Sequence, residues 1–270
     1  MVLAEYPAEC IDLIVTSPPY ADKRKGGIPL KNYVPTLLSM SEQFIRVLKP
    51  IGSFVLNIKE GALNGERQTY VMELVLALKQ QGWLWTEEYI WHKSNSVPGK
   101  WPNRFRDNWE HCYHFTKQRK FYMDQDAVMV PIGEWAGPRL RNLSEKDKRR
   151  DDSAVGSGFG KNISNWLDRK KAYPTNVIYL ATECGNKNHS AAFPLELPIW
   201  FIKLFTKPGD VVLDPFVGSG TTAVAAEQLG RHYLGIDISI DNCEIAEARL
   251  KASQQKARVR KAKPQQPGLF

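Results

Sequence analysis

The chain has 270 residues, 43% of them hydrophobic and 24% charged, which is ordinary for a globular protein with a sizeable core. No apolar run reaches the ~18 residues of a membrane helix, and the N-terminus lacks the pattern of a secretory signal. Lysine and arginine number 37 against 29 acids, a formal net charge of +8, which favours a polyanionic partner. The four widely spaced cysteines predict no disulfide framework and a reducing, cytoplasmic compartment.

Strand and helix patterns alternate in the N-terminal part of the chain. A short apolar run that ends in a Pro-rich turn predicts a buried strand, and Pro50 and Gly52 are expected to end the helix that follows it. In chain order, the expected elements are a strand at 11–15, a helix at 34–48, a strand at 53–58, a helix at 67–81 and β-rich stretches at 84–93 and 109–116.

The regular pattern fails between residues 122 and 172, where proline, glycine and charge dominate. A stretch of this length without regular structure inside a compact domain usually carries function or is disordered. We therefore interpret it as an inserted irregular lobe. Its basic residues include Arg139 and Arg141.

Order returns in the C-terminal part. The expected elements are a helix at 194–205, a strand at 210–213, a Gly-rich turn at 214–222, a helix at 221–229, a strand at 232–236 and a helix from about 241 to 257. Strand and helix alternate at both ends of the chain, so the fold class is α/β with a mainly parallel sheet. Ligands of such sheets bind beyond the carboxyl ends of the strands.

The turn at 214–222 reads DPFVGSGTT. Gly218 and Gly220 allow the backbone to turn sharply and to approach a ligand closely. The turn lacks the Gly-Lys-Ser/Thr ending of a phosphate-binding loop. Asp237 ends the next strand roughly 20 residues on, where an acid can bind ribose hydroxyls. This pattern predicts a site for a nucleoside-containing cofactor.

The N-terminal strand runs into a second motif, TSPPY at residues 16–20. The two prolines hold a rigid turn and have no backbone N–H groups to donate. The Ser17 hydroxyl and the Pro18 carbonyl are therefore acceptors with fixed directions, and Tyr20 offers a flat face for stacking. Together they suit a planar heterocycle with an exocyclic amino group.

In this order, the two motifs closely resemble the β class of amino-DNA methyltransferases, which use S-adenosylmethionine. The segment HSAAFP at 189–194 is also similar to that class, and the resemblance covers about 5–120 and 173–250. It implies a Rossmann-like methyltransferase sheet with a circularly permuted motif order. The expected parts are a catalytic half at 1–121, a target-recognition insertion at 122–172, a cofactor-binding half at 173–258 and a flexible basic tail at 259–270.

The resemblance also implies the roles of individual residues. The target base would be held by Ser17, Pro18, Pro19 and Tyr20. The cofactor would be bound by Asp214, Phe216, Gly218, Gly220 and Thr221 at its methionine end, by Asp237 at its ribose, and by Ser190, Phe193 and Pro194, which close the pocket. Relatives usually begin with a further strand ending in Gly-Asp, whose acid faces the cofactor adenine, whereas this sequence starts in the helix after it. Either the N-terminus is truncated or another residue contacts the adenine.

The implied reaction moves a methyl group onto the amino nitrogen of a base flipped out of double-stranded DNA. Carbon methylation of cytosine needs a nucleophilic cysteine, normally after a proline. The cysteines here follow Glu9, His111, Glu183 and Asn242 instead, so the sequence argues against methylation at carbon. Within the resembled family, serine at the position of Ser17 goes more often with cytosine N4 than with adenine N6, so the resemblance favours cytosine N4 slightly. An RNA or protein-amide methyltransferase of the same fold and an inactive DNA-binding homologue remain as alternatives.

Double-stranded DNA is the expected partner, and the candidate contacts are Lys93, Lys100, Arg104, Arg106, Arg139 and Arg141. Ordinary surface charge explains these residues equally well. His111, Cys112 and His114 do not predict a metal site, because neighbouring strand residues point to opposite faces and no second pair has ligand spacing. β-class enzymes often pair, so a homodimer is one assembly to expect. The expected setting is a bacterial cytoplasm, with the enzyme associated with the nucleoid through DNA.

Overall fold

The computed structural model describes residues 2–21, 27–96, 98–99, 102–134, 138, 141–142, 144, 169–183 and 193–262, with the backbone alone from 256 to 262. The chain divides into two compact units, which we describe separately. The larger unit comprises Met1–Asp124 and Asn176–Phe270, and the smaller comprises Gln125–Thr175. None of the described helices is both long and apolar enough to cross a membrane.

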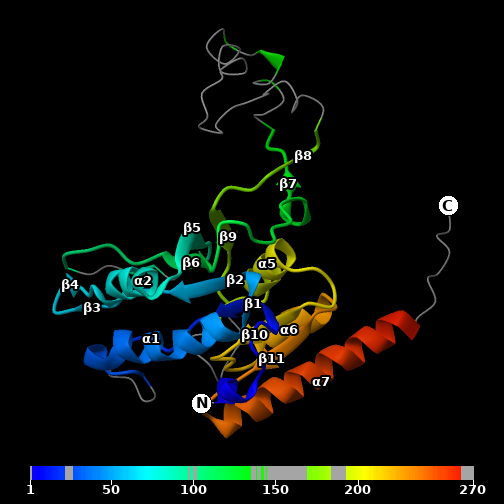
Figure 1. The fold of residues 1–270 in the computed structure, drawn as a ribbon. Coiled ribbons are helices and arrows are strands. Elements are labelled where there is room, and N and C mark those ends of the chain that lie inside the picture. The colour runs from blue at the N-terminus through cyan, green and yellow to red at the C-terminus, as the bar shows by residue number, and fades with distance from the viewer. Residues whose placement is uncertain are drawn as a thin grey trace, which may run out of the picture. The chain divides into compact units, whose positions relative to one another are not determined.

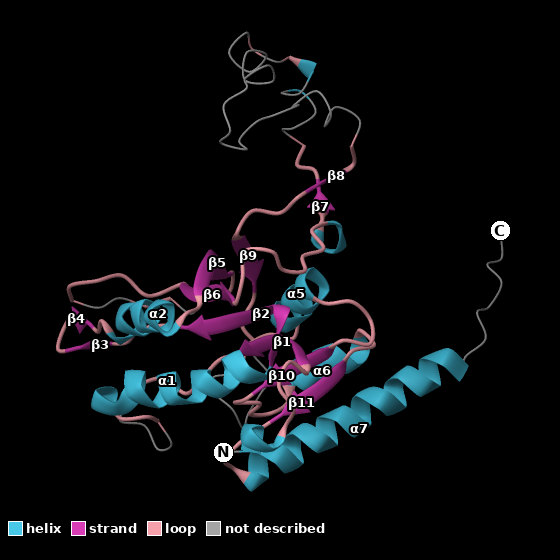
Figure 2. Cartoon of the chain, in the orientation of Figure 1, coloured by secondary structure: helices cyan, strands magenta, loops and turns pink. Residues whose placement is uncertain are grey.

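A seven-stranded sheet forms the centre of the larger unit (Figures 1 and 2). Its strands, in spatial order, are β11 (His232–Gly235), β10 (Val211–Asp214), β1 (Ile11–Thr16), β2 (Leu48–Ile58), β6 (Trp109–Thr116), β5 (Leu84–Lys93) and β9 (Val177–Leu180). Within this sheet β6 alone runs against the other strands. The carboxyl ends of the six other strands and the start of β6 therefore share one edge, which we call the carboxyl edge.

The chain's two ends meet in the middle of this sheet. β1 pairs in parallel with β10, with Leu13 opposite Val212 and Ile14 opposite Leu213. Both strands are almost entirely buried. The N-terminal and C-terminal motifs therefore begin side by side at the carboxyl edge, although nearly two hundred residues separate them in sequence.

Helices cover both faces of the sheet. Their bounds are α1 (Leu30–Val47), α2 (Tyr70–Gln81), α5 (Glu196–Phe205), α6 (Thr221–Gln228) and α7 (Ile240–Ala262). Side chains of alternate strand residues point to opposite faces. Phe54 and Phe115 pack in one core cluster with α1 and α2. On the other face, the His114 ring lies 4.3 Å from Phe205 of α5, measured between centroids.

The core beneath α1 and α2 is rich in aromatic residues. Trp83 and Phe115 are almost fully buried, and each contacts Phe54 at a centroid distance below 6 Å, 5.3 and 5.7 Å respectively. The Trp83 indole N–H donates to the Ser41 hydroxyl at 2.7 Å, so its polar atom is satisfied inside the core. Burial of each large side chain contributes about 1.5–3 kcal/mol, and the sheet is thereby held rigid beneath the site.

The structure differs from the sequence expectations where tertiary pairing decides. β2 begins at Leu48 and runs through Pro50 and Gly52, which were expected to end the helix and precede the strand. Leu48 pairs with Ile11, and the register shifts before Leu13. A Cβ on Gly52 would lie 2.8 Å from the Asp12 carbonyl oxygen, so the strand requires glycine there.

Two further elements were not expected. The hairpin formed by β3 (Ala62–Leu63) and β4 (Glu66–Arg67) turns at Asn64 and Gly65, whose φ angles are 53° and 84°. An Asn-Gly pair with positive φ is the usual two-residue hairpin turn, and it moves the start of α2 to Tyr70. The short strand β9 joins the sheet by parallel pairing with β5.

In the smaller unit, the short strands β7 (Val130–Pro131) and β8 (Lys171–Ala172) pair in antiparallel fashion. A 3-10 turn at Asp126–Val128 precedes them. The unit's range of 125–175 lies close to the inserted lobe expected at 122–172. Residues 145–168 of that lobe lie outside the described part of the chain.

Candidate functional site

Asp214 connects the two motifs at the carboxyl edge. Its Oδ1 accepts a hydrogen bond of 2.6 Å from the hydroxyl of Thr16, the last residue of β1. Its Oδ2 accepts another of 2.6 Å from Thr222, and the Phe216 N–H donates to Oδ1 at 3.1 Å. Burial raises the pKa of Asp214 to about 6, and the hydrogen bonds oppose that rise. The carboxylate therefore holds the two strand ends in one arrangement.

The glycine turn is tied to the end of β11. The Gly218 N–H donates to Asp237 Oδ2 at 2.9 Å. Gly220 has a φ of +84°, and a Cβ there would lie 2.7 Å from Ala246 Cβ of α7, so this glycine permits the close packing of two helices. A Cβ placed on Gly218 would meet only the Phe216 carbonyl oxygen, at 3.9 Å, so the turn has open space beside Gly218.

Asp237 is oriented by its own loop. Its Oδ1 accepts hydrogen bonds from the Ser239 N–H at 2.9 Å and the Asn242 side-chain amide at 3.0 Å. The residue stays partly exposed just beyond β11. A carboxylate fixed in this way can accept hydrogen bonds from ribose hydroxyls. These donors, acceptors and the space at Gly218 fit a nucleoside cofactor.

Arg249 of α7 fixes the same turn from behind. Its Nη1 donates to the Ser219 carbonyl at 2.8 Å, to the Ser219 hydroxyl at 2.7 Å and to the Thr221 hydroxyl at 3.2 Å. Thr221 is 4% exposed, so its hydroxyl is engaged within the protein. Arg249 was not among the expected site residues, because α7 contains several basic residues with no pattern that singles out one.

The Pro-rich motif leaves the carboxyl edge beside this turn. Pro18 is buried, and Ser17, Pro19 and Tyr20 are partly exposed. The Tyr20 hydroxyl donates to Glu110 Oε2 at 2.9 Å. Burial, followed by the charge of Glu110, raises the pKa of Tyr20 well above its usual value. The hydroxyl is therefore satisfied inside the protein, while the residue as a whole stays partly exposed.

Glu110 was not among the expected site residues either. It is the second residue of β6, only 6% exposed, and its Oε1 pairs with the Lys93 ammonium group. Lys93 was one of the possible contacts to DNA, and it lies instead at the end of β5 in this ion pair. Its ammonium nitrogen is also 5.0 Å from the centroid of the Trp91 ring.

The remaining expected cofactor residues lie where α5 begins. Phe193 is 8% exposed, and the Pro194 carbonyl accepts a hydrogen bond of 3.1 Å from the Leu197 N–H. They thus lie just before α5, whose first residue is Glu196. Ser190 lies outside the described residues.

The expected DNA contacts occupy different places. Arg104 lies in the loop between β5 and β6, 3.6 Å from Asp107, and Arg106 of the same loop donates to the Ser96 carbonyl. This loop lies at the carboxyl edge. Arg141 is exposed in the smaller unit, and Lys100 and Arg139 lie outside the described residues.

The histidines of β6 serve the fold. His111 lies between the carboxylates of Glu60 and Glu88 and stacks on Tyr113 at a centroid distance of 4.8 Å. His114 is buried, and burial lowers its pKa to about 3, so the ring is neutral. In the part of the chain that the structure describes, no three His, Cys, Asp or Glu side chains are grouped to hold a metal ion.

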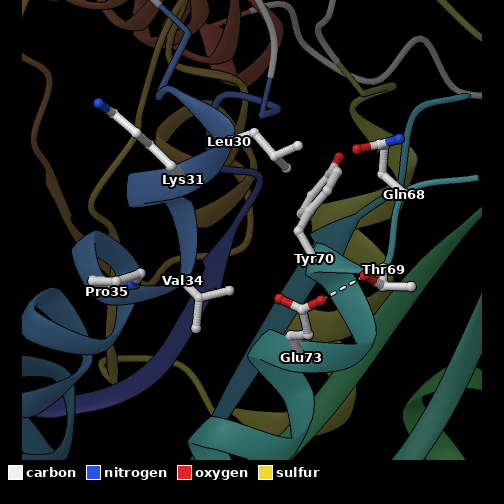
Figure 3. Close-up of a pocket in the computed structure, with 8 residues that line it drawn as sticks. All are labelled: Leu30, Lys31, Val34, Pro35, Gln68, Thr69, Tyr70 and Glu73. Atoms are coloured by element: carbon white, nitrogen blue, oxygen red, sulfur yellow. Dashed lines mark hydrogen bonds between the residues drawn. The ribbon is translucent and has the colours of Figure 1, made fainter. Parts of the chain in front are cut away.

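A surface pocket of about 300 Å³ lies between the first turns of α1 and α2 (Figure 3). Its lining residues are Leu30, Lys31, Val34, Pro35, Gln68, Thr69, Tyr70 and Glu73. In this close-up Thr69 points toward Glu73, and its hydroxyl donates to that carboxylate. The lining includes no residue of either motif, so we do not place the cofactor there.

The fold and the order of the motifs define a class: a Rossmann-like α/β methyltransferase whose Pro-rich motif precedes its glycine turn. A family model described as DNA methylase, N6_N4_Mtase, matches residues 11–248. The chain therefore belongs to the N6/N4 family of DNA amino-methyltransferases. The family resemblance inferred from the two motifs is confirmed.

The relatives that the chain resembles include several bacterial type II methyltransferases. The chain is 29% identical to the type II methyltransferase M.PvuII of Proteus hauseri over 264 residues, 88% of this chain and 77% of that protein. It is 28% identical to the type II methyltransferase M.Cfr9I of Citrobacter freundii over 287 aligned positions, 93% and 84% of the two chains.

Solved structures agree on the fold. The PvuII DNA methyltransferase, described as cytosine-N4-specific, superposes with a TM-score of 0.67 at 22% identity and covers 94% of this chain and 88% of its own. A Thermus thermophilus protein solved with S-adenosyl-L-methionine gives a TM-score of 0.61 at 24% identity, with coverage of 93% and 90%. The expected fold class and the family's cofactor, S-adenosylmethionine, are thus confirmed.

Proposed function

We propose that the chain methylates the exocyclic amino nitrogen of a base flipped out of a specific double-stranded DNA sequence, and that the base is cytosine, modified at N4. The observation that carries the proposal is the hydrogen bond between Thr16 and Asp214, which joins the start of the Pro-rich motif to the start of the glycine turn. A methyl donor at the turn and a base at Ser17–Tyr20 would then share one edge of the sheet.

The roles follow from the chemistry of the groups. Bound S-adenosylmethionine supplies a methyl group on a positively charged sulfonium. The Ser17 hydroxyl and the Pro18 carbonyl would accept hydrogen bonds from the two amino hydrogens, which makes the nitrogen more nucleophilic. Stacking on Tyr20 would recover ~1–3 kcal/mol of the cost of flipping the base. Most of the acceleration would come from positioning.

Asp214 would act through position and not as a base. Both of its oxygens accept hydrogen bonds from within the protein, and the residue is 3% exposed. This supports direct transfer between a donor and an acceptor that are already aligned, with no covalent enzyme intermediate.

Two observations favour cytosine N4. In the family, serine directly before the two prolines accompanies cytosine N4 more often than adenine N6, and this chain has Ser17 there. The PvuII methyltransferase structure, with the TM-score of 0.67, is described as cytosine-N4-specific. The test is expression in a methylase-deficient host, followed by digestion of the DNA to nucleosides and mass spectrometry. We expect N4-methyldeoxycytidine with the wild-type chain and its loss with Ser17→Ala. Detection of N6-methyldeoxyadenosine instead would show that the target base is adenine. Unmodified DNA would overturn the proposed activity.

Measuring cofactor affinity together with methylation distinguishes residues that hold the base from residues that bind the cofactor. Ser17→Ala and Tyr20→Ala should lower single-turnover methylation strongly while calorimetry gives an almost unchanged affinity for S-adenosylmethionine. Normal methylation by both variants would show that the base is held elsewhere. Cofactor affinity without methylation of any duplex by the wild type would favour an inactive homologue.

We further propose that the smaller unit recognises the target sequence. Its basic residues suit phosphate contacts, and it is compact and separate from the catalytic sheet. Replacement of Arg139 and Arg141 by alanine should weaken DNA binding and reduce the slope of log affinity against log salt by about 1–2. An unchanged slope would assign DNA binding to another surface.

A further inference from the structure

We propose that Glu110, held in place by Lys93, is a positioning residue that fixes the ring of Tyr20 for the target base. This inference rests on the proposed function, because it assumes that the base stacks on Tyr20. It adds two residues that neither motif contains. They come from strands β5 and β6, on the opposite side of β2 from the Pro-rich motif.

The ring of Tyr20 is oriented by a contact at its hydroxyl end. Pro18 and Pro19 restrict the backbone, but they leave the two side-chain torsions of Tyr20 free. The Tyr20 hydroxyl lies at the far end of the ring and donates to Glu110 Oε2 at 2.9 Å. A hydrogen bond at that point, with the backbone fixed at the other end, restrains both torsions.

Glu110 can hold Tyr20 only because it is itself held. It is 6% exposed, and a carboxylate at that depth is costly unless it is paired and hydrogen-bonded. One oxygen accepts from Tyr20 and the other pairs with Lys93. The Trp91 ring beneath the Lys93 ammonium is anchored in turn, since its N–H donates to the Leu180 carbonyl of β9 at 3.1 Å. A continuous set of contacts thus runs from the far edge strand to the Pro-rich motif.

The charge state of Tyr20 agrees with this role. Burial and then the charge of Glu110 raise its pKa well above the usual value, so the hydroxyl keeps its proton and donates at neutral pH. The other ionisable groups that face it are Tyr33 and Tyr70, which raise the pKa further. A ring fixed before the base arrives loses less conformational entropy on binding, which favours the flipped state.

The test must separate positioning from simple stability. Tyr20→Phe keeps the ring and removes the donor. The double variant Glu110→Leu with Lys93→Met replaces the ion pair by apolar side chains of similar size, a change that buried pairs often tolerate. Glu110→Gln keeps a hydrogen-bonding group beside the tyrosine hydroxyl. The matched control is Glu88→Gln, a carboxylate of the same strand pair that accepts from His111.

Three quantities are measured for each variant: the single-turnover methylation rate, the fluorescence of 2-aminopurine at the target position of duplex DNA, and the affinity for S-adenosylmethionine by calorimetry. We expect Tyr20→Phe and the Glu110/Lys93 double variant each to lower the rate about tenfold and to reduce the fluorescence change, as for one lost hydrogen bond. Cofactor affinity should not change. Glu110→Gln should be much faster than the Glu110/Lys93 double variant, with a rate close to that of the wild type. The control Glu88→Gln should have the wild-type rate.

Combining Tyr20→Phe with the double variant decides how Glu110 acts. If it acts through the tyrosine hydroxyl, the triple variant is also only about tenfold slower; independent effects would multiply to about a hundredfold and overturn the inference. Wild-type rates in both Tyr20→Phe and the double variant would also overturn it, while a slow Tyr20→Ala would leave the proposed function standing. If the double variant fails to fold, the comparison of Tyr20→Phe with Glu110→Gln still decides, because Gln should be clearly faster.

Discussion

The Thr16 hydroxyl donates a hydrogen bond of 2.6 Å to the carboxylate of Asp214, across 198 positions of the sequence. Each residue is the last of its strand, and the two strands are neighbours at the centre of the sheet. One bond therefore joins the motif that would hold the base to the motif that would hold the cofactor.

Thr16→Val should weaken both stability and catalysis. Valine has nearly the same shape and suits a buried strand, but it leaves Asp214 Oδ1 with one donor fewer. We expect a loss of ~1–3 kcal/mol in the free energy of unfolding and a lower single-turnover rate. Thr222→Val is the matched control, because it removes the 2.6 Å bond to the other oxygen without touching the Pro-rich motif. Equal catalytic losses in the two variants would contradict a special role of the Thr16 bond.

Asp214 should make stability depend on pH in an unusual direction. Burial raises its folded-state pKa to about 6, above its unfolded value, so the folded state binds the extra proton. This contribution is fully present below about pH 4 and is lost as the pH rises through about 6. Asp214→Asn cannot titrate and can still hydrogen-bond to both threonines.

The measurement for this prediction is urea unfolding of wild type and Asp214→Asn between pH 4.5 and 7.5. Relative to the variant, the wild type should lose about 2 kcal/mol across that range. Curves that stay parallel would mean that the carboxyl group keeps an ordinary pKa in the folded protein.

The two glycines of the cofactor turn should fail in different ways. Gly220→Ala places a Cβ 2.7 Å from Ala246 Cβ at a φ of +84°, so we expect it to destabilise the protein by about 2–4 kcal/mol. Gly218→Ala has open space around the new Cβ and a φ of +49°, and should cost about 1 kcal/mol of stability. Its methyl group would occupy space beside the turn, so cofactor affinity should fall more than stability.

Thermal unfolding and calorimetry with S-adenosylmethionine separate the two glycine effects. The expected result is that Gly220→Ala shows the larger drop in melting temperature and Gly218→Ala the larger relative drop in affinity. The reverse order would show that the open space beside Gly218 is not used by the cofactor.

The parts of this molecule that the sequence predicted are those in which the signal is local. The buried strand ending at Thr16 and the glycine turn after Asp214 each combine an apolar run with a Pro-rich or Gly-rich break, so both motifs could be placed at strand ends. That the two motifs lie side by side could be predicted only from the resemblance to a family, because no local pattern in the sequence gives the order of strands within a sheet. At Gly52 the local signal was misleading. The sequence predicts the end of a helix there, but Gly52 lies within β2, where the Asp12 carbonyl approaches too closely for any side chain.

The residues that support the motifs could not be predicted in this way. Glu110 lies 90 positions from Tyr20, and Lys93 lies 17 positions from Glu110, so each belongs to a strand whose register is set by pairing. The hairpin at Asn64 and Gly65 is different, because its Asn-Gly pair is a local signal that predicts a two-residue turn from the sequence alone.

Arg249→Met should loosen the cofactor turn without unfolding the protein. The guanidinium donates to Ser219 and Thr221 from α7, so its loss frees the turn between β10 and α6 while methionine keeps most of the side-chain packing. We expect the affinity for S-adenosylmethionine to fall about tenfold, as for the loss of a charged hydrogen bond. Lys251→Met is the control, because this exposed residue of the same helix only approaches Glu247 at 3.6 Å. Calorimetry on both variants at matched salt decides: equal affinities would mean that the turn keeps its shape without Arg249.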